Sequence, residues 1–211
     1  MTDLVLFDLD GTITDSQEGI IHSIQHALKK KGIECEADEL KSFIGPPLKG
    51  SFQEKFPQID PDEAVANYRE YYADKGIFEN RVYEGIPELL EKLKDMNIRA
   101  AIATSKPEGY ARQIIDHFGL SDYLEAVYGA TMDSSRVNKE DILDYALAQS
   151  HAESPIMVGD RKFDIEGAHV HHLPGIGVTY GFGSRQELEK AGADCIIDQP
   201  AELIEWIQTR Q

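Results

Sequence analysis

The sequence predicts an α/β protein: a doubly wound parallel-sheet core into which an all-helical unit is inserted. Short apolar runs alternate with amphipathic stretches along most of the chain, as in proteins built from strand–helix–strand units. This alternation is interrupted from about Ser16 to Arg81, where helical periodicity continues without a convincing strand. The 211 residues provide enough chain for one core and one inserted module.

The first predicted strand is Leu4–Phe7, a run of four apolar residues that ends at a polar cluster. Such a run is too short for a helix and is typical of a strand buried on both faces. Similar runs occur at residues 100–103, 126–128, 156–158, 176–179 and 195–197. Ligands bind at the carboxyl ends of strands in sheets of this kind, so the polar residues that follow these runs are the candidates for function.

The helices are predicted from apolar residues spaced three and four apart. In the core they are residues 87–96, 141–149, 163–171, 184–191 and 200–207. In the interrupted stretch they are residues 19–31, 37–43, 48–56 and 62–75. The sequence therefore predicts an α/β core of residues 1–15 and 82–211 and a helical insert of residues 16–81.

Composition restricts the partners and the compartment. The net charge of -17 would repel nucleic-acid backbones and anionic lipid, so no polymeric nucleic acid is expected. No apolar run approaches the roughly 20 residues of a membrane span, and the N-terminus lacks the basic flank and apolar length of a secretory signal. Two distant cysteines, Cys35 and Cys195, offer no disulfide framework. We expect a cytoplasmic protein without membrane contact.

Two carboxylates, Asp8 and Asp10, directly follow the first strand. Acids this close do not easily both ionise without a cation; Mg²⁺ would neutralise one, and a partly desolvated Asp10 could then hold a proton. A carboxylate can also accept a phosphoryl group, which divides hydrolysis into two displacements. The alternatives are a polar turn or a calcium loop. The calcium loop is excluded because Ile13 and Gly19 occupy its glycine and glutamate positions.

Two more segments have the chemistry of phosphate binding. Thr104-Ser105-Lys106 ends the run at 100–103, so a hydroxyl and free amides could hold phosphoryl oxygens; an ordinary helix cap would explain it equally well. Lys139 precedes the helix predicted to begin near Asp141, where an ammonium could offset charge on a phosphoryl group in transfer. A single lysine is more often solvated surface.

Asp160 and Asp164 follow the strand run at 156–158. Mg²⁺ typically takes one or two carboxylates together with substrate oxygen and water, so Asp160 and Asp8 make a plausible site. A surface charge cluster would not explain why these acids also lie at a strand end.

In combination, these segments resemble the haloacid dehalogenase superfamily of phosphotransferases, whose four motifs match, in order, Asp8/Asp10, Thr104, Lys139 and Asp160/Asp164. The resemblance covers nearly the whole chain. It implies that Asp8 is the nucleophile and Asp10 the general acid and then base. It further implies that Thr104 and Ser105 bind the phosphoryl group and that Lys139 stabilises charge.

The resemblance also implies a metal site and a lid. Mg²⁺ would be held by Asp8, the backbone carbonyl of Asp10 and Asp160, with Asp164 in support. The helical insert resembles the family's cap of the first type, which closes over the site and selects substrate. Arg161 departs from the pattern, because a small hydroxyl residue is common after the aspartate of the fourth motif.

Finer signals resemble the branch labelled phosphoglycolate phosphatase or 5'-nucleotidase: Phe43–Leu48, Tyr71–Gly76 and Gly175–Ser184. We therefore expect a small phosphorylated metabolite as substrate, with nucleoside 5'-monophosphates ahead of 2-phosphoglycolate. The expected assembly is a monomer or homodimer.

Four other functions are alternatives to a phosphatase. A dehalogenase needs neither metal nor a second acid, so Asp10 and Asp160 argue against it, and a phosphonatase usually lacks an acid at the Asp10 position. A phosphomutase uses the same four motifs and remains open. A non-enzymatic receiver-like module, doubly wound and phosphorylated on aspartate, would leave the helical insert without a purpose.

Overall fold

The computed structural model describes residues 2–133 and 135–210 and divides into two compact units. The first combines residues 1–14 with 82–211, and the second is Asp15–Arg81. Met1, Ser134 and Gln211, and with them both ends of the predicted core, lie outside the described residues. Within those described residues, every helix is too short or too polar to span a membrane.

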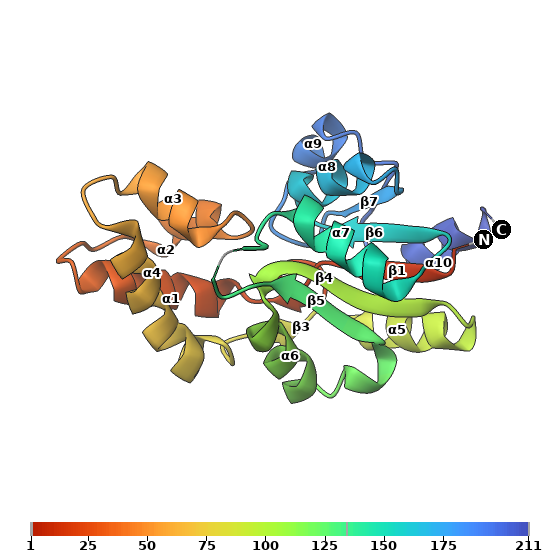
Figure 1. Ribbon diagram of the computed structural model, residues 1–211, viewed down its shortest axis with the longest axis horizontal. Coiled ribbons are helices and arrows are strands. Elements are labelled where there is room, and N and C mark those ends of the chain that lie inside the picture. Colours follow the sequence, from red (N-terminus) through yellow and green to blue (C-terminus); the bar gives the residue numbers. More distant parts are fainter. Residues whose placement is uncertain (1, 134, 211) are drawn as a thin grey trace. The chain divides into compact units, whose positions relative to one another are not determined.

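The first unit contains a six-stranded parallel sheet, which confirms the predicted fold class (Figure 1). Its strands are β1 (Leu4–Phe7), β4 (Arg99–Pro107), β5 (Ala126–Ala130), β6 (Pro155–Gly159), β7 (Gly175–Val178) and β8 (Cys195–Ile197). The order across the sheet is β5-β4-β1-β6-β7-β8. All four residues of β1 are completely buried, which explains why its sequence is continuously apolar.

Helices cover both faces of this sheet. They are α5 (Ile86–Asp95), α6 (Glu108–His117), α7 (Lys139–Ser150), α8 (Lys162–Val170), α9 (Arg185–Lys190) and α10 (Glu202–Gln208), with a 3-10 turn η3 (Ser121–Tyr123). Figure 1 shows α5 and α6 on one side and α7 and α8 on the other. Right-handed crossovers place the helices on opposite faces because the chain changes direction across the sheet. It first runs from β1 to β5, and then returns past β1 towards β8.

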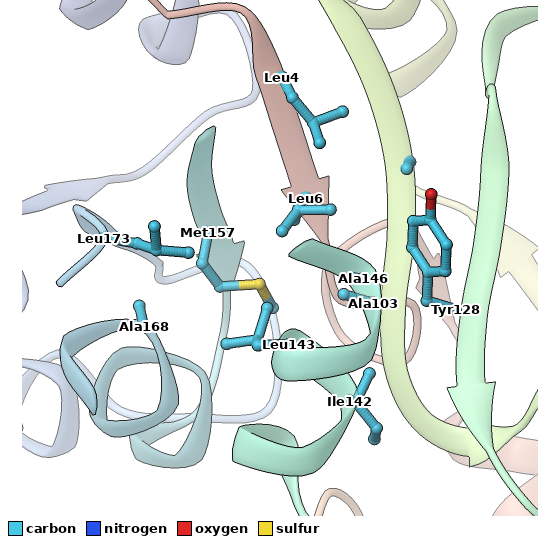
Figure 2. Close-up of a cluster of buried hydrophobic side chains, with 11 residues drawn as sticks. Leu4, Leu6, Ala103, Tyr128, Ile142, Leu143, Ala146, Met157, Ala168 and Leu173 are labelled. Carbon is cyan, nitrogen blue, oxygen red and sulfur yellow. The ribbon is translucent and has the colours of Figure 1, made fainter. Parts of the chain in front are cut away.

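The layer between the sheet and α7 and α8 is a cluster of buried apolar side chains (Figure 2). Leu6 of β1 and Met157 of β6 meet Leu143 of α7 and Ala168 of α8, and all four side chains are fully buried. Burial of each large apolar side chain stabilises the fold by about 1.5–3 kcal/mol. This packing holds α7 and α8 against the sheet.

The second unit is helical. It contains α1 (Gln17–Lys29), α2 (Ala37–Leu40), a 3-10 turn η1 (Lys41–Phe43), α3 (Leu48–Lys55), α4 (Pro61–Tyr71) and a π-helical turn η2 (Tyr72–Gly76). Short strands β2 (Thr14–Asp15) and β3 (Arg81–Val82) pair where the chain passes between the units. Arg81 is therefore a strand residue, contrary to the expectation of no strand up to that position.

The strand order identifies the edge at which a ligand binds. Counted along the chain the order is 3-2-1-4-5-6, and it reverses direction between β1 and β6. Ligands of such sheets bind beyond the carboxyl ends of the strands at this reversal. Receiver modules have a different, flavodoxin-like order, so the receiver alternative is wrong.

Candidate active site

The predicted site residues come together at the carboxyl edge of the sheet, within the first unit. Phe7 lies opposite Ile102 of β4 and Val158 of β6, so Asp8 is the first residue beyond the end of β1. Its amide donates to the carbonyl of Val158 at 2.9 Å. One carboxylate oxygen each from Asp8, Asp160 and Asp164 lies within 4.8 Å of the others.

Lys139 is buried beside two of these acids, Asp8 and Asp164. Its Nζ lies 3.0 Å from Asp8 Oδ1 and 2.7 Å from Asp164 Oδ1, and it donates to the carbonyl of Ala103 at 2.8 Å. Burial on its own would lower the pKa of Lys139, but Asp164 and Asp8 raise it above its ordinary value. Lys139 is therefore a charged ammonium within the site and not a solvated surface lysine.

The position of Lys139 in the secondary structure differs from the prediction. It is the first residue of α7 and does not precede a helix that begins near Asp141. The physical reason is Asn138, whose extended backbone with φ of -75° and ψ of 153° ends the preceding segment and starts the helix two residues earlier. The first turn therefore fixes the stem of the lysine.

Asp160 is held by the backbone. Its Oδ2 accepts hydrogen bonds from the amides of Phe182 at 2.7 Å and Gly183 at 3.3 Å, and Thr12 Oγ1 lies 3.5 Å from its Oδ1. Burial, then Asp164 and Asp8, raise the pKa of Asp160 well above its ordinary value, although the Phe182 amide opposes this. In the sequence, residues 175–184 indicate only the branch of the family, and nothing in them predicts that their amides anchor Asp160.

Position 11, where the backbone of the first motif approaches Asp160, requires a glycine. Its φ is +89°, a region that side chains rarely adopt, and an added Cβ would lie 2.3 Å from Asp160 Oδ2. Only glycine fits both the conformation and the space. The glycine of Asp8-Leu9-Asp10-Gly11-Thr12 is thus explained by close approach to the fourth motif.

Asp164 connects the acid cluster to α8. Its Oδ2 accepts from the amide of Arg161 at 3.0 Å, while its Oδ1 faces Lys139. Burial raises the pKa of Asp164 above its ordinary value despite the opposing ammonium of Lys139. The side chain of Arg161, where the sequence departs from the family pattern, pairs with Glu187 of α9 at 2.9 Å.

Asp10 does not contribute its carboxylate to the cluster. Its Oδ1 lies 2.6 Å from Nζ of Lys106 instead. Lys106 lies within the second motif, but the sequence predicts no role for it. In the structure only 6% of its side chain is exposed, which is unusual for a lysine and indicates a specific role.

Thr104 and Ser105 lie at the end of β4. Thr104 is 1% exposed, and its Oγ1 accepts from the amide of Lys106 at 3.2 Å; Ser105 is half-buried. Helix α6 begins after Pro107 without a side-chain cap. Neither hydroxyl therefore serves as the ordinary helix cap that the sequence left as an alternative.

The cluster suits a divalent cation. Asp8, Asp160 and Asp164 carry three formal negative charges, and Lys139 supplies one positive charge, which leaves an excess of two within buried surroundings. All three donors are carboxylate oxygens, the ligands of hard ions such as Mg²⁺. The chemistry of the donor set therefore fits the predicted metal.

Comparison with known proteins identifies the family. Residues 5–178 match the family model of haloacid dehalogenase-like hydrolases, and the chain belongs to this family. A 5'-nucleotidase of Pseudomonas aeruginosa is 44% identical over 189 residues, which are 87% of this chain and 86% of the relative. The crystal structure of a predicted phosphatase from Clostridium acetobutylicum has a TM-score of 0.94 at 44% identity, with 99% of both chains covered.

A third relative has a different name. Tyrosine-protein kinase PtkA of Mycobacterium tuberculosis is 38% identical over 196 residues, which are 92% of this chain and 67% of the relative. Relatives named 5'-nucleotidase and phosphoglycolate phosphatase both occur among the matches, as the predicted branch requires. The predictions of the family, its branch and an enzyme of the phosphatase class are confirmed.

Proposed function

We propose that this chain is a Mg²⁺-dependent phosphomonoester hydrolase that works through an aspartyl phosphate on Asp8. The observation that supports this most is the convergence of Asp8 with Lys139, Asp160 and Asp164 at the switch point of the sheet. A single acid at a strand end would have many explanations. Three buried acids that lie close together, two of them paired with one buried lysine, match the demands of phosphoryl transfer.

Asp8, Asp160 and the backbone carbonyl of Asp10 would hold Mg²⁺, with Asp164 in support. When bound, the ion supplies positive charge to the phosphoryl oxygens and neutralises the acid cluster. Asp8 would offer one carboxylate oxygen to the metal, and its other oxygen would be available as a nucleophile. Lys139 stays charged beside it and stabilises the phosphoryl group during transfer.

The reaction would proceed in two displacements. In the first, a carboxylate oxygen of Asp8 forms a bond to phosphorus, the ester P–O bond breaks, and the leaving oxygen takes a proton from Asp10. In the second, water attacks the phosphorus, gives a proton to Asp10, and the bond to Asp8 breaks to release inorganic phosphate. Thr104 and Ser105 would hold phosphoryl oxygens throughout.

The substrate class follows from the relatives. The 44% identical relative is named 5'-nucleotidase, which favours nucleoside 5'-monophosphates, and 2-phosphoglycolate is the alternative. A phosphomutase would pass the same phosphoryl group to a sugar hydroxyl, and the kinase name of the mycobacterial relative implies transfer to tyrosine.

We propose that residues 15–81 form the cap that selects substrate. A cytoplasmic location and a monomeric or homodimeric state remain predictions.

A panel of phosphate esters tests this function. Release of inorganic phosphate with Mg²⁺ should be highest, as kcat/KM, for a nucleoside 5'-monophosphate. A preference for 2-phosphoglycolate would select the other member of the branch. Stable phosphoryl transfer to a sugar or tyrosine acceptor, without release of phosphate, would contradict hydrolysis.

A further inference from the structure

We propose that Lys106 is a positioning residue that fixes the carboxyl group of Asp10 for proton transfer. The inference rests on the proposed function, because it assigns to Lys106 an action on the acid/base partner of the two displacements. It concerns a residue that the four motifs leave without a role. Lys106 acts through Asp10 and not on the phosphoryl group.

The geometry divides the two buried lysines between the acids. Lys139 pairs with Asp8 and Asp164, whereas Lys106 pairs with Asp10 at 2.6 Å. In the part of the chain that the structure describes, Asp10 has no second ion pair. The side chains of Lys106 and Asp10 are only 6% and 14% exposed, so water competes little for this contact.

The backbone of β4 directs Lys106 to Asp10. Side chains alternate along a strand, so Thr104 and Lys106 lie on one side and Ser105 on the other. The register of β4 with β5 shifts between Thr104 and Pro107, and the amide of Lys106 donates to Thr104 Oγ1 at 3.2 Å. A local irregularity of this kind commonly redirects a side chain next to an active site.

Burial of a lysine is costly unless the charge is paired. The charged side chain of Lys106 can therefore be buried because Asp10 pairs with it. The same ion pair holds the carboxylate of Asp10 in place. The contact engages Oδ1 of Asp10, and no hydrogen bond of its Oδ2 is found among the described residues. One oxygen is thus fixed and the other is left for the leaving group and, later, for water.

Fixing the carboxyl group matters because a catalytic group displaced by about 1 Å can lose roughly 10²-fold in rate. General acid–base catalysis contributes about 10²- to 10⁴-fold. Its contribution depends on the leaving group: an alkyl oxygen needs a proton to depart, whereas a nitrophenolate departs without one. A residue that acts through Asp10 must therefore matter more for alkyl esters.

The test compares Lys106→Met with the wild type by rapid-quench measurement of phosphoenzyme formation, with Mg²⁺ present. For an alkyl phosphate such as a nucleoside 5'-monophosphate we expect a loss of about 10²-fold. For nitrophenyl phosphate the loss should be less than about tenfold. Lys106→Arg, which keeps the charge, should recover part of the rate with the alkyl ester.

A double-mutant comparison separates action through Asp10 from other effects. In an Asp10→Asn background, Lys106→Met should change phosphoenzyme formation by less than about twofold. An equal loss for both esters, or a full further loss in the Asp10→Asn background, would overturn the inference, because Lys106 would then act on the phosphoryl group or on the fold.

Lys92→Met is the matched control, since Lys92 is an exposed lysine on α5 and should leave both rates unchanged. If Lys106→Met does not fold, as judged by circular dichroism, Lys106→Gln replaces it, because glutamine keeps a donor without the charge. Failure of the proposed function has a different signature: the wild type would form no phosphoenzyme from either ester, which would overturn both.

Discussion

At the scale of single residues, the cluster of Asp8, Asp160 and Asp164 is expected to lower the stability of the metal-free protein. Asp160 is fully buried between two other carboxylates, and burial and these neighbours raise its pKa. Backbone amides and not a cation hold its Oδ2. Without bound metal, the excess negative charge is a source of repulsion in the folded state.

Removal of that charge should therefore stabilise the metal-free protein. Asp160→Asn keeps an oxygen that can accept from the amides of Phe182 and Gly183, and we expect the free energy of unfolding in chelator to rise by about 1 kcal/mol. Turnover with Mg²⁺ should be lost in the same variant. Denaturant titrations in chelator measure this, and a less stable variant would contradict the electrostatic account.

Asp8→Asn tests the nucleophile. The amide fits the same space but cannot accept the phosphoryl group, so turnover should fall by at least about 10³-fold while circular dichroism is unchanged. Asp10→Asn is the companion variant: phosphoenzyme should form slowly and accumulate, because its hydrolysis also needs Asp10. Radiolabelled phosphate retained on folded Asp8→Asn protein would refute the covalent route.

The sequence identifies residues whose chemistry is visible in their neighbours along the chain. Asp8 and Asp160 are conspicuous because each directly follows a buried strand. Lys106 is not, since its importance arises from a register shift in β4 that no periodicity reports. The amides of Phe182 and Gly183 are equally hidden, because they act through the backbone from positions 22 and 23 residues after Asp160.

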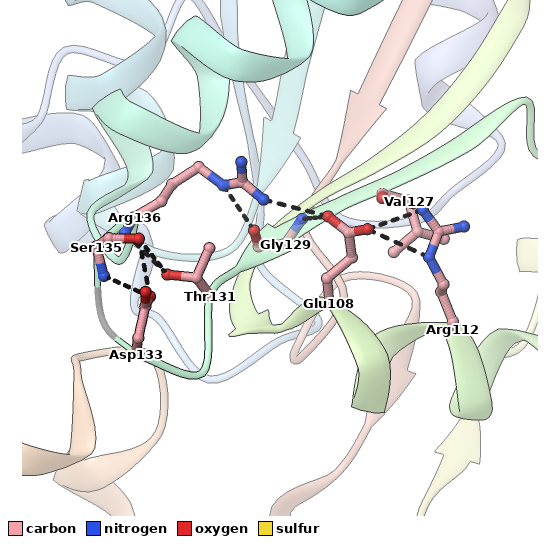
Figure 3. A network of polar contacts seen from close by, with 8 residues as sticks. All are labelled: Glu108, Arg112, Val127, Gly129, Thr131, Asp133, Ser135 and Arg136. Carbon is pink, nitrogen blue, oxygen red and sulfur yellow. Dashed lines mark hydrogen bonds and ion pairs between the residues drawn. The ribbon is translucent and has the colours of Figure 1, made fainter.

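At the scale of elements, Arg136 lies in the segment between β5 and α7 and contacts neighbouring elements through its guanidinium (Figure 3). Arg136 donates from Nε to the carbonyl of Gly129 at 2.9 Å, and its Nη2 lies 3.2 Å from Glu108 of α6. Its guanidinium lies 3.7 Å from the ring centroid of Tyr145 on α7. Arg136 thus joins three elements, and Figure 3 shows Glu108 between Arg136 and Arg112.

Loss of Arg136 should disturb Lys139 from a distance. We expect Arg136→Met to lower kcat about tenfold and the free energy of unfolding by about 1–3 kcal/mol, because a partly buried carboxylate loses a partner. Arg112→Met is the matched control: Arg112 contacts the same Glu108, but it is more exposed and belongs to α6. Steady-state kinetics and thermal melts should separate the two, and equal effects would argue against a role for this segment.

The elements themselves were predictable to different degrees. The six strands of the parallel sheet match the predicted runs to within four residues, because each contains a short apolar run, whereas β2 and β3 were not predicted. Helix α6 was not delimited, since Pro107 and Gly109 at its start resemble a turn. The helix predicted at 62–75 is α4 followed by the π-helical turn η2, a change of winding that leaves the apolar spacing almost unaltered.

At the scale of the whole molecule, the net charge of -17 is the feature that most affects stability. The excess negative side chains repel one another, so any salt should stabilise the fold somewhat by screening. Mg²⁺ should do more: at a concentration 100 times its Kd, specific binding adds about 2.7 kcal/mol. Thermal melts with Mg²⁺ and with NaCl of equal ionic strength measure the difference. Asp160→Asn should show the salt effect alone, and an equal response of the wild type to both salts would argue against the site.

The topology was only partly accessible from the sequence. Alternating strands and helices predict a parallel sheet, but the position of β1 between β4 and β6 depends on contacts between segments about 100 to 150 residues apart. Local periodicity does not contain this information. The strand order was needed to exclude a receiver module.

The central place of β1 also has a consequence for biosynthesis. On the ribosome, Leu4–Phe7 is made before both of its partner strands, and the second of them, Pro155–Gly159, emerges only after nearly 150 further residues, on the order of 7 to 30 seconds later. Until then this wholly apolar strand cannot be enclosed between its two neighbours. Both partner strands follow the helical unit Asp15–Arg81 in the chain, so chaperones that hold unfolded apolar segments should engage Leu4–Phe7 early in translation.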